Sequence, residues 1–358
     1  MLKITKKISK ISALFAAYIL LSCTPEKEQI TVSSNLNNGV FIVNEGPYGS
    51  GTGTVSFFDH TSKSITNDLF GKANNNTPLG NVVQSMNIIN GYAYIVVNNG
   101  NKIEIANANN FKSAGTITGL NQPRYIYQVN DTKAYISEWG ADGKTGAIKV
   151  LNLTSNTVTK TIATGKGTEK MLKKGNYVYV TCKGGYGYDT VVTVIDFAKD
   201  SVVKSIAVGP NPNSIQEDAD GNLWVLCSGK NKSDYSGLEI NGRLVKIDPS
   251  INSVLFSITF PSTSSQPSDL IINKAKNTLY FNYDGKVYSH TTSANTFDNT
   301  AIISKSYYGL GIDPASDIIY AGDAGNFSAA GKLFRYNTNG TLLDSATVGI
   351  APNGFYFK

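Results

Sequence analysis

Histidine and cysteine are scarce in this sequence, with two histidines and three cysteines among 358 residues. A Ser-His-Asp triad needs a histidine beside its nucleophile, and zinc sites are built largely from several His and Cys ligands. The chain therefore has little material for either, and we expect no metal and no other cofactor. His60 falls in a predicted hairpin turn, and His290 lies on a predicted strand, where packing is its expected role.

A long apolar run is missing as well. The apolar stretch at residues 11–21 is too short to cross a bilayer, which takes about 20 residues in a helix. It follows a segment with four lysines and precedes LLSC at Leu20–Cys23, which is the order of a secretory signal. The quartet resembles the lipobox of bacterial lipoproteins, and by that resemblance Cys23 is the lipidated residue. An ordinary signal peptide, with Cys23 incidental, stays open as the alternative.

A basic surface is missing too, although the formal net charge is +6. Four of the lysines lie in the first ten residues, so that 28 basic residues face 26 acidic ones after residue 22. No Lys/Arg cluster remains to bind a phosphate backbone. We expect no nucleic-acid partner. The chain divides into a signal peptide (1–22), a polar tether that follows lipidated Cys23 (23–37) and a folded domain (38–358).

What the chain does contain is a repeat rich in glycine, tyrosine, asparagine and threonine, which favour strands and turns. An aromatic residue recurs near the start of a short strand, at intervals of 40 to 56 residues. The seven copies are Phe41, Tyr94, Tyr135, Tyr179, Trp224, Tyr280 and Tyr320. Another short strand precedes each copy but the first, often opened by proline. Four short strands in such a period are typical of propeller blades.

A displaced copy of the leading strand supports this interpretation. The seventh copy is PNGFYF at residues 352–357, far from the first aromatic strand in sequence. A propeller must close its ring or leave an exposed edge, and this segment can complete the blade that residues 39–70 begin. A pair of β-sandwiches gives no reason for the displacement. We therefore predict an all-β fold, a seven-bladed β-propeller of four-stranded antiparallel blades closed by the C-terminal strand.

Each predicted third strand ends in a short polar residue. The series is Asp59, Asn107, Asn152, Asp196, Asp248, Thr291 and Asn337. A ring of functional carboxylates is one interpretation. Recurrence in every blade favours another, in which these side chains cap hairpin turns by accepting backbone N–H bonds.

Cys182 and Cys227 occupy equivalent places in neighbouring repeats. An exported protein could oxidise them, but stacked sheets lie about 10 Å apart. A disulfide needs Cα atoms within about 7 Å. We expect two buried free thiols.

Three segments resemble reactive motifs incompletely. GADGKTG at 140–146 lacks the first glycine of a phosphate loop and joins two strands. DADGN at 218–222 has Gly229 where a calcium loop needs a bidentate Glu. GSGTG at 49–53 has no helix after it. No Asp or Glu stands out as a catalytic acid, so we expect no enzymatic activity, although a carboxylate pair could still serve a lyase or hydrolase.

Function is expected on the face where the loops between second and third strands meet the starts of the innermost strands. These loops carry glycines and scattered aromatics, which bury much area at low entropic cost. Polar residues at the strand starts, Gln84 and Ser268 among them, would orient a ligand. The candidate ligand-binding residues are Tyr48, Arg124, Trp139, Glu169, Tyr186, Tyr188, Asn213, Tyr235, Tyr308, Phe327 and Asn353. The alternative is that Gly and Tyr only build compact loops.

Two repeats, GAIKVLNLTSNTVTKTIATG and TVVTVIDFAKDSVVKSIAVGPNPNSI, resemble the YncE-like, YVTN-type propeller repeat. GVFIVNEGPYGSGTGTVSFFD, behind a lipobox, is similar to surface lipoproteins of the Bacteroidetes in that group. The resemblance covers residues 38–358. It implies the role of the BtuG group, which captures vitamin B12 (cobalamin) at the cell surface and passes it to a TonB-dependent transporter in the outer membrane. It transfers no individual binding residue.

Two other classes remain open at this point. An accessory subunit of an outer-membrane complex would show a broad protein-facing patch and no small-ligand pocket. A lyase or hydrolase would need a cluster of acids and bases in a cleft at the channel mouth. A capture protein would bind a corrinoid or another tetrapyrrole through its aromatic rim.

Overall fold

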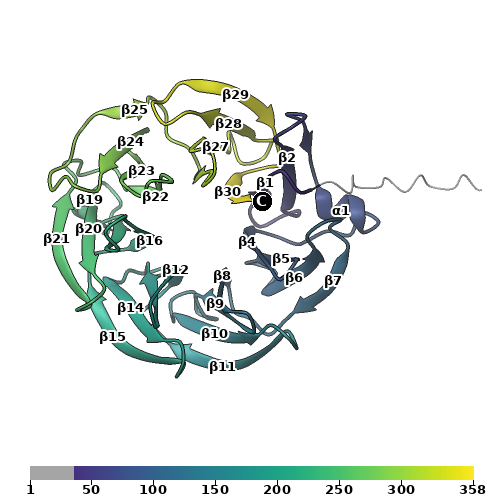
Figure 1. The fold of residues 1–358 in the computed structure, drawn as a ribbon, viewed down its shortest axis with the longest axis horizontal. Helices are drawn as coiled ribbons and strands as arrows, with labels where there is room; N and C mark the ends of the chain where they lie inside the picture. Colours follow the sequence, from purple (N-terminus) through teal and green to yellow (C-terminus); the bar gives the residue numbers. More distant parts are fainter. Residues whose placement is uncertain (1–35) are drawn as a thin grey trace, which may run out of the picture. The chain divides into compact units, whose positions relative to one another are not determined.

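The computed structural model describes residues 36–358, and these form a ring of seven four-stranded antiparallel sheets (Figure 1). The predicted seven-bladed β-propeller is therefore confirmed. The predicted signal peptide, Cys23 and most of the tether lie outside the described residues. No helix within 36–358 has the length and apolarity needed to span a bilayer.

The strands fall into four layers, counted from the centre of the ring. The innermost strands are β4 (Val83–Ile89), β8 (Pro123–Asn130), β12 (Thr168–Lys174), β16 (Pro212–Glu217), β22 (Ser268–Ile272), β26 (Gly309–Ile312) and β30 (Pro352–Phe357). The second strands are β1 (Gly39–Asn44), β5 (Tyr92–Val97), β9 (Lys133–Glu138), β13 (Tyr177–Cys182), β17 (Leu223–Cys227), β23 (Thr278–Tyr283) and β27 (Ile319–Asp323).

The two outer layers follow the same order. The third strands are β2 (Thr54–Asp59), β6 (Lys102–Asn107), β10 (Ala147–Asn152), β14 (Val191–Asp196), β20 (Arg243–Asp248), β24 (Lys286–Thr291) and β28 (Lys332–Tyr336). The outermost strands are β3 (Ile65–Thr66), β7 (Ser113–Ile117), β11 (Thr157–Ala163), β15 (Ser201–Ala207), β21 (Ser253–Thr259), β25 (Ala301–Ile303) and β29 (Leu342–Thr347).

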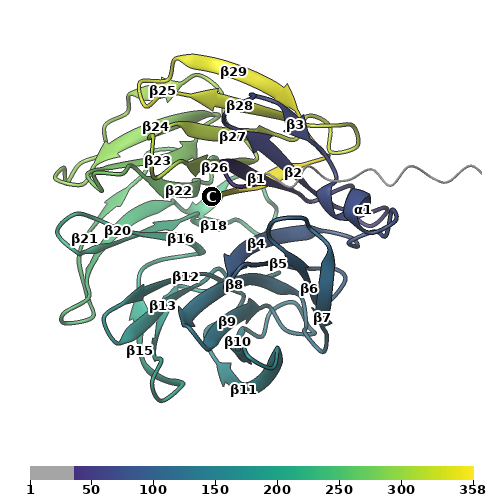
Figure 2. The ribbon, with the colours of Figure 1, turned by 45° about the vertical axis from the view of Figure 1, so that its right-hand side comes forward.

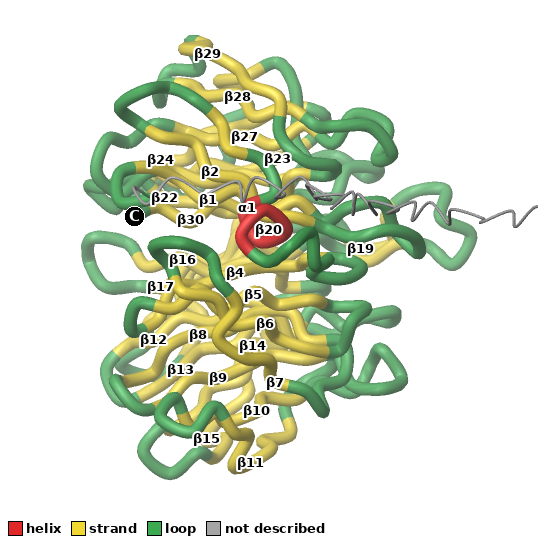
Figure 3. The backbone as a smooth tube through the Cα atoms, turned by 90° about the vertical axis from the view of Figure 1, so that its right-hand side faces the viewer, coloured by secondary structure: helices red, strands yellow, loops and turns green. Residues whose placement is uncertain are grey.

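Two elements fall outside this plan, and the sequence pattern did not predict them. The short helix α1 (Leu69–Ala73) lies between β3 and β4 and packs beside β2 (Figure 2). A small hairpin, β18 (Lys230–Asn231) with β19 (Leu238–Ile240), is inserted between β17 and β20. The remaining loops gather on the two sides of the layered strands (Figure 3).

The ring closes as the sequence predicted. β30 pairs antiparallel with β1, with Val40 opposite Phe357 and Ile42 opposite Phe355, so one blade has the order β3-β2-β1-β30. This blade joins the two ends of the described chain through main-chain hydrogen bonds. Closure removes the exposed sheet edge that an open ring would leave.

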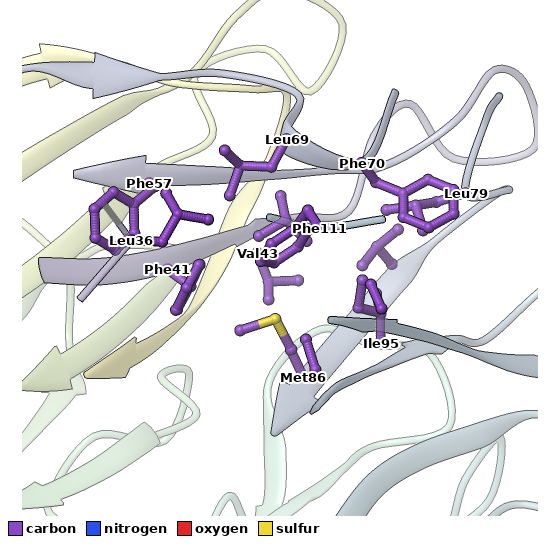
Figure 4. Close-up of a cluster of buried hydrophobic side chains, with 14 of the residues drawn as sticks. Leu36, Phe41, Val43, Phe57, Leu69, Phe70, Leu79, Met86, Ile95 and Phe111 are labelled. Atoms are coloured by element: carbon purple, nitrogen blue, oxygen red, sulfur yellow. The ribbon is translucent and has the colours of Figure 1, made fainter. Parts of the chain in front are cut away.

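The hydrophobic core lies between neighbouring blades. Second strands are buried on both faces because each packs against the sheet on either side. One apolar cluster joins Phe41 and Val43 of β1 to Met86 of β4, Ile95 of β5 and Phe111 (Figure 4). Such clusters tie each blade to the next.

The recurring aromatic residue also links blades through its polar end. The hydroxyl of Tyr94 donates to Asn156 at 2.8 Å, in the turn between the third and outermost strands of the next blade. Tyr135 and Tyr179 reach Asp200 and Asn252 in the same way. We call these three contacts the inter-blade latches. They give the aromatic position of the repeat a structural reason.

A related contact involves His60 at the closing blade. The hydroxyl of Tyr320 lies 2.9 Å from His60 Nε2. His60 sits in a turn, as expected. His290 is buried against Trp224, with ring centroids 5.5 Å apart, so the predicted packing role is confirmed.

Six of the seven polar residues at the ends of the third strands cap turns with their side chains, as predicted. Asp59, Asn152 and Asp196 each accept two backbone N–H bonds from residues two and three positions later. Asn107, Asp248 and Asn337 also accept backbone N–H bonds. Thr291 is the exception, because its main-chain oxygen and not its side chain accepts the N–H of Ala294. A ring of free functional carboxylates is therefore wrong.

Cys182 and Cys227 are buried free thiols, which confirms that prediction. Burial raises the pKa of the Cys182 thiol to about 11, so it stays protonated near neutral pH. Burial also raises the pKa of Cys227.

Candidate binding site at the channel mouth

A cavity of about 290 Å³ opens where the innermost strands begin. Seven residues from the starts of these strands line it, one from each blade. They are Gln84, Arg124, Glu169, Asn213, Ser268, Tyr308 and Asn353. All seven were expected there from the repeat, and five of them were candidate binding residues. We call this cavity the mouth and these seven residues the mouth residues.

A repeated backbone turn aims these side chains inward. In five blades the residue two positions before the mouth residue has a left-handed backbone, with φ between 50° and 57°. These turn residues are Val82, Gln122, Gly167, Asn211 and Ala351. Valine with positive φ is a strained choice, which neighbouring contacts must hold in place.

The carbonyls of these turns accept hydrogen bonds from the residue that follows each second strand. The five donors are the amides of Asn98, Trp139, Lys183, Ser228 and Glu45. Each of these five blades thus presents a second polar or aromatic residue beside its mouth residue. Glu45, Lys183 and Ser228 line the cavity.

In several blades a glycine directly follows this second residue, at the point where the loop turns away from the cavity. Gly46 and Gly140 have φ of 82° and 84°, and a Cβ on either would come within 2.5 Å of a backbone oxygen. Several loop glycines therefore have a structural reason, as the alternative interpretation of the loops proposed. The aromatics are not explained in this way.

Arg124, Trp139 and Glu169 form one network. The guanidinium of Arg124 lies 4.2 Å above the Trp139 ring, and its Nε donates to Glu169 Oε1 at 3.1 Å. Trp139 Nε1 donates to the same oxygen at 3.0 Å, and Arg124 also donates to Gln84. Burial opposes the charge of Arg124, but Glu169, Tyr125 and Glu45 together outweigh it, so the pKa of Arg124 is raised. The pair is thus a fixed, charged element of the mouth.

Glu45, Tyr308 and Asn353 form a second network. Tyr308 donates its hydroxyl to Glu45 Oε2 at 2.6 Å, and Asn353 Nδ2 donates to Oε1 at 2.8 Å. Burial raises the pKa of Glu45 despite these two donors. A carboxylate that is desolvated in a cavity favours the arrival of a cation or further donors.

The predicted rim aromatics fall into two groups, those that pack against other side chains and those at exposed loop tips. Tyr186 packs edge-on against Trp139 at 5.5 Å, and Phe327 packs against Tyr308 at 4.9 Å. Tyr188 lies under the ammonium of Lys230 at 4.9 Å. Tyr48 and Tyr235 are 78% and 81% exposed at loop tips. None of the six rim aromatics lines the cavity itself, so those of the first group lie beside it.

The sequence pattern missed several lining residues, namely Glu45, Tyr125, Lys170, Lys183, Ser228, Asp269 and Tyr307. Glu45, Lys183 and Ser228 share one signal, because each directly follows a second strand. Lys170, Tyr125 and Asp269 each follow a mouth residue by one position. Both positions recur from blade to blade and could have been read from the repeat.

The cavity continues into the central channel. A second cavity of about 360 Å³ shares Tyr125 and Lys170 with the mouth and is lined further by Tyr127, Met171 and Tyr356. Burial raises the pKa of Tyr356 to about 12, so its hydroxyl stays neutral. Within residues 36–358, no group of three or more His, Cys, Asp or Glu side chains is placed to hold a metal ion.

Several solved structures share the fold at low identity. A quinonprotein alcohol dehydrogenase-like protein from Bacteroides thetaiotaomicron has a TM-score of 0.65 at 17% identity, over 90% of this chain and 78% of its own. The periplasmic gluconolactonase PpgL of Pseudomonas aeruginosa has a TM-score of 0.66 at 14% identity, over 89% and 99%. AztD from Citrobacter koseri has 0.53 at 12%, over 88% and 96%. The neighbours thus include an enzyme.

No curated protein matches the sequence. A family model does match, over residues 38–358, and this range includes every described strand of the propeller. The chain belongs to the family described as a domain of unknown function, DUF5074.

Proposed function

We propose that this protein is a non-enzymatic capture protein that binds cobalamin or a related corrinoid across the mouth. The proposal includes a lipid anchor at Cys23, display on the outer membrane and delivery to a TonB-dependent transporter. The observation that carries it is a polar mouth with exposed aromatic side chains beside it. Resemblance of the repeats to the YncE-like group supports the choice of ligand.

The chemistry of the face suits such a ligand. A corrin ring is broad and flat, with apolar faces and amide groups at its edge, and is too large for a cavity of about 290 Å³. It would therefore lie across the rim, against Trp139, Tyr186 and Phe327. Amide arms would then reach the carboxylates and amines of the mouth, since ligand sites combine apolar walls with a few placed polar groups.

The non-enzymatic part of the proposal depends on the carboxylates. Arg124 and Trp139 hold Glu169, and Tyr308 and Asn353 hold Glu45. Each carboxylate already accepts from two donors, so these groups are better placed to orient a bound ligand than to exchange protons with it.

Calorimetric titration of the purified chain with cyanocobalamin tests the proposal. We expect saturable one-to-one binding. Absence of heat at high micromolar ligand, with the protein folded by circular dichroism, would contradict it.

A protein partner is a second candidate, favoured by Tyr48 and Tyr235 at exposed loop tips away from the cavity. Exposed tyrosines are common anchors in protein interfaces. If cyanocobalamin fails to bind, this candidate takes its place.

A further inference from the structure

The charges of the mouth are only partly paired within the protein. Arg124 and Glu169 form an ion pair at 3.1 Å. Lys170, Lys183, Glu45 and Asp269 also line the cavity, and none of them takes part in an ion pair within residues 36–358. Two positive and two negative side chains therefore face one cavity outside any ion pair, and the more distant charges of Arg124 and Glu169 also act on Glu45.

These charges are separated by blade. Lys170 lies on β12 and Lys183 follows β13, so both belong to one blade. Glu45 follows β1, in the blade that contains β30, and Asp269 lies on β22. Figure 1 shows β12 and β30 on opposite sides of the channel. Among the charges outside ion pairs, the two lysines thus lie on one side of the channel and Glu45 lies on the opposite side.

The side with Glu45 also has unused acceptor capacity. Asn353 Oδ1 is buried without a hydrogen-bond partner, although Nδ2 of the same side chain donates to Glu45. A buried acceptor without a donor costs free energy, which an arriving N–H group would recover. Burial raises the pKa of Glu45, and a nearby cation would stabilise its charged form. Glu45 therefore also favours a positively charged group at this side of the cavity.

We propose that the mouth binds a small zwitterion, with its ammonium group at Glu45 and Asn353 and its carboxylate at Lys183 and Lys170. This site lies beneath the aromatic rim and does not depend on corrinoid capture. A lone cation or anion would satisfy one side and leave the other uncompensated. A ligand with both charges satisfies both.

A ladder of ω-amino acids tests this inference, from glycine through 4-aminobutyrate to 6-aminohexanoate, titrated calorimetrically into the full chain. We expect one length to bind best, at least tenfold more tightly than butylamine or butyrate. Equal binding of a singly charged probe, or no binding by any member of the ladder, would overturn it.

Two variants, each with a matched control, test which residues bind the two charged ends of the ligand. Glu45→Gln and Lys183→Met are each expected to weaken the best probe at least tenfold. Asp131→Asn and Lys112→Met, at exposed turns, are expected to leave its affinity unchanged. Equal effects of a mouth variant and its control would count against the site.

Proton release gives a readout that needs no variant. Because the ammonium lowers the raised pKa of Glu45, binding in mildly acidic buffer should release protons. The measured heat should then change with the ionisation enthalpy of the buffer, and this dependence should vanish in Glu45→Gln. A persistent dependence in the variant would contradict the assignment to Glu45. Cyanocobalamin and the ω-amino acids are titrated separately into the unmodified chain, so failure of one proposal is distinguishable from failure of the other.

Discussion

Trp139 connects the rim to the mouth at the scale of a single residue. Its ring supports Arg124 on one side and meets Tyr186 on another, while its indole N–H holds Glu169. The side chain thus orders the charged groups below it and offers apolar surface above. Trp139 can therefore contribute to ligand affinity by direct contact and by holding Arg124 in position.

Gly46 allows a residue-scale prediction about the loop beside Glu45. A Cβ at Gly46 would lie 2.5 Å from the Thr52 carbonyl oxygen, whereas Gly49, in the same loop, has open space and a similar φ of 73°. Both alanine variants carry the strain of positive φ, but only Gly46→Ala adds a backbone clash. We expect it to cost about 1–3 kcal/mol more than Gly49→Ala. Equal urea midpoints would contradict this.

At the scale of the element, the second strand carries both the blade core and the inter-blade latch. Tyr135 is fully buried, and its hydroxyl meets Asp200, which also binds Lys133 Nζ at 2.9 Å. The latch therefore joins a strand to the outer turn of the next blade.

Removing one latch hydroxyl tests this role. Tyr135→Phe leaves the ring in place but takes a donor from a partly buried carboxylate, so we expect a loss of about 1–3 kcal/mol in the free energy of unfolding. Urea denaturation measures it, with Tyr92→Phe on the exposed start of β5 as control. The latch has no energetic role if the two variants unfold at the same midpoint.

Strands were predictable from the sequence, and the partners within the mouth were not. The recurring aromatic, the capping Asx residues and the displaced C-terminal copy at 352–357 can be seen in the sequence, so blade number and ring closure followed from them. The Glu45–Tyr308 bond joins residues 263 positions apart and exists only because the ring closes. Helix α1 and the β18–β19 hairpin interrupt the period, which gave no signal for them.

At the scale of the whole molecule, the pairing of β1 with β30 closes the ring of blades. His60 lies at its boundary, beside Tyr320 of the preceding blade. Burial lowers the pKa of His60 below its ordinary value of 6.5. The folded state therefore favours the neutral ring at this boundary.

This gives a pH dependence with a defined sign. The unfolded chain takes up a proton near pH 6.5 and the folded His60 resists it, so its contribution to stability is complete above that pH and falls as the pH drops. We expect His60→Gln to lose less stability than the unmodified protein between pH 7 and pH 5. His290, whose pKa burial also lowers, contributes equally to both. Denaturant titrations at the two pH values measure the free energy of unfolding of each protein. An identical loss of stability in the two proteins would contradict the prediction.

The central claim, that the mouth face captures a corrinoid, is tested most directly by the cyanocobalamin affinity of Trp139→Ala beside Tyr92→Ala. Trp139 packs against Arg124 and Glu169, which line the mouth, whereas Tyr92 is an exposed aromatic that contacts neither. We predict at least a tenfold loss, about 1.4 kcal/mol, for Trp139→Ala and an unchanged affinity for Tyr92→Ala. Equal affinities of the two variants, or no binding by the unmodified chain, would contradict the account.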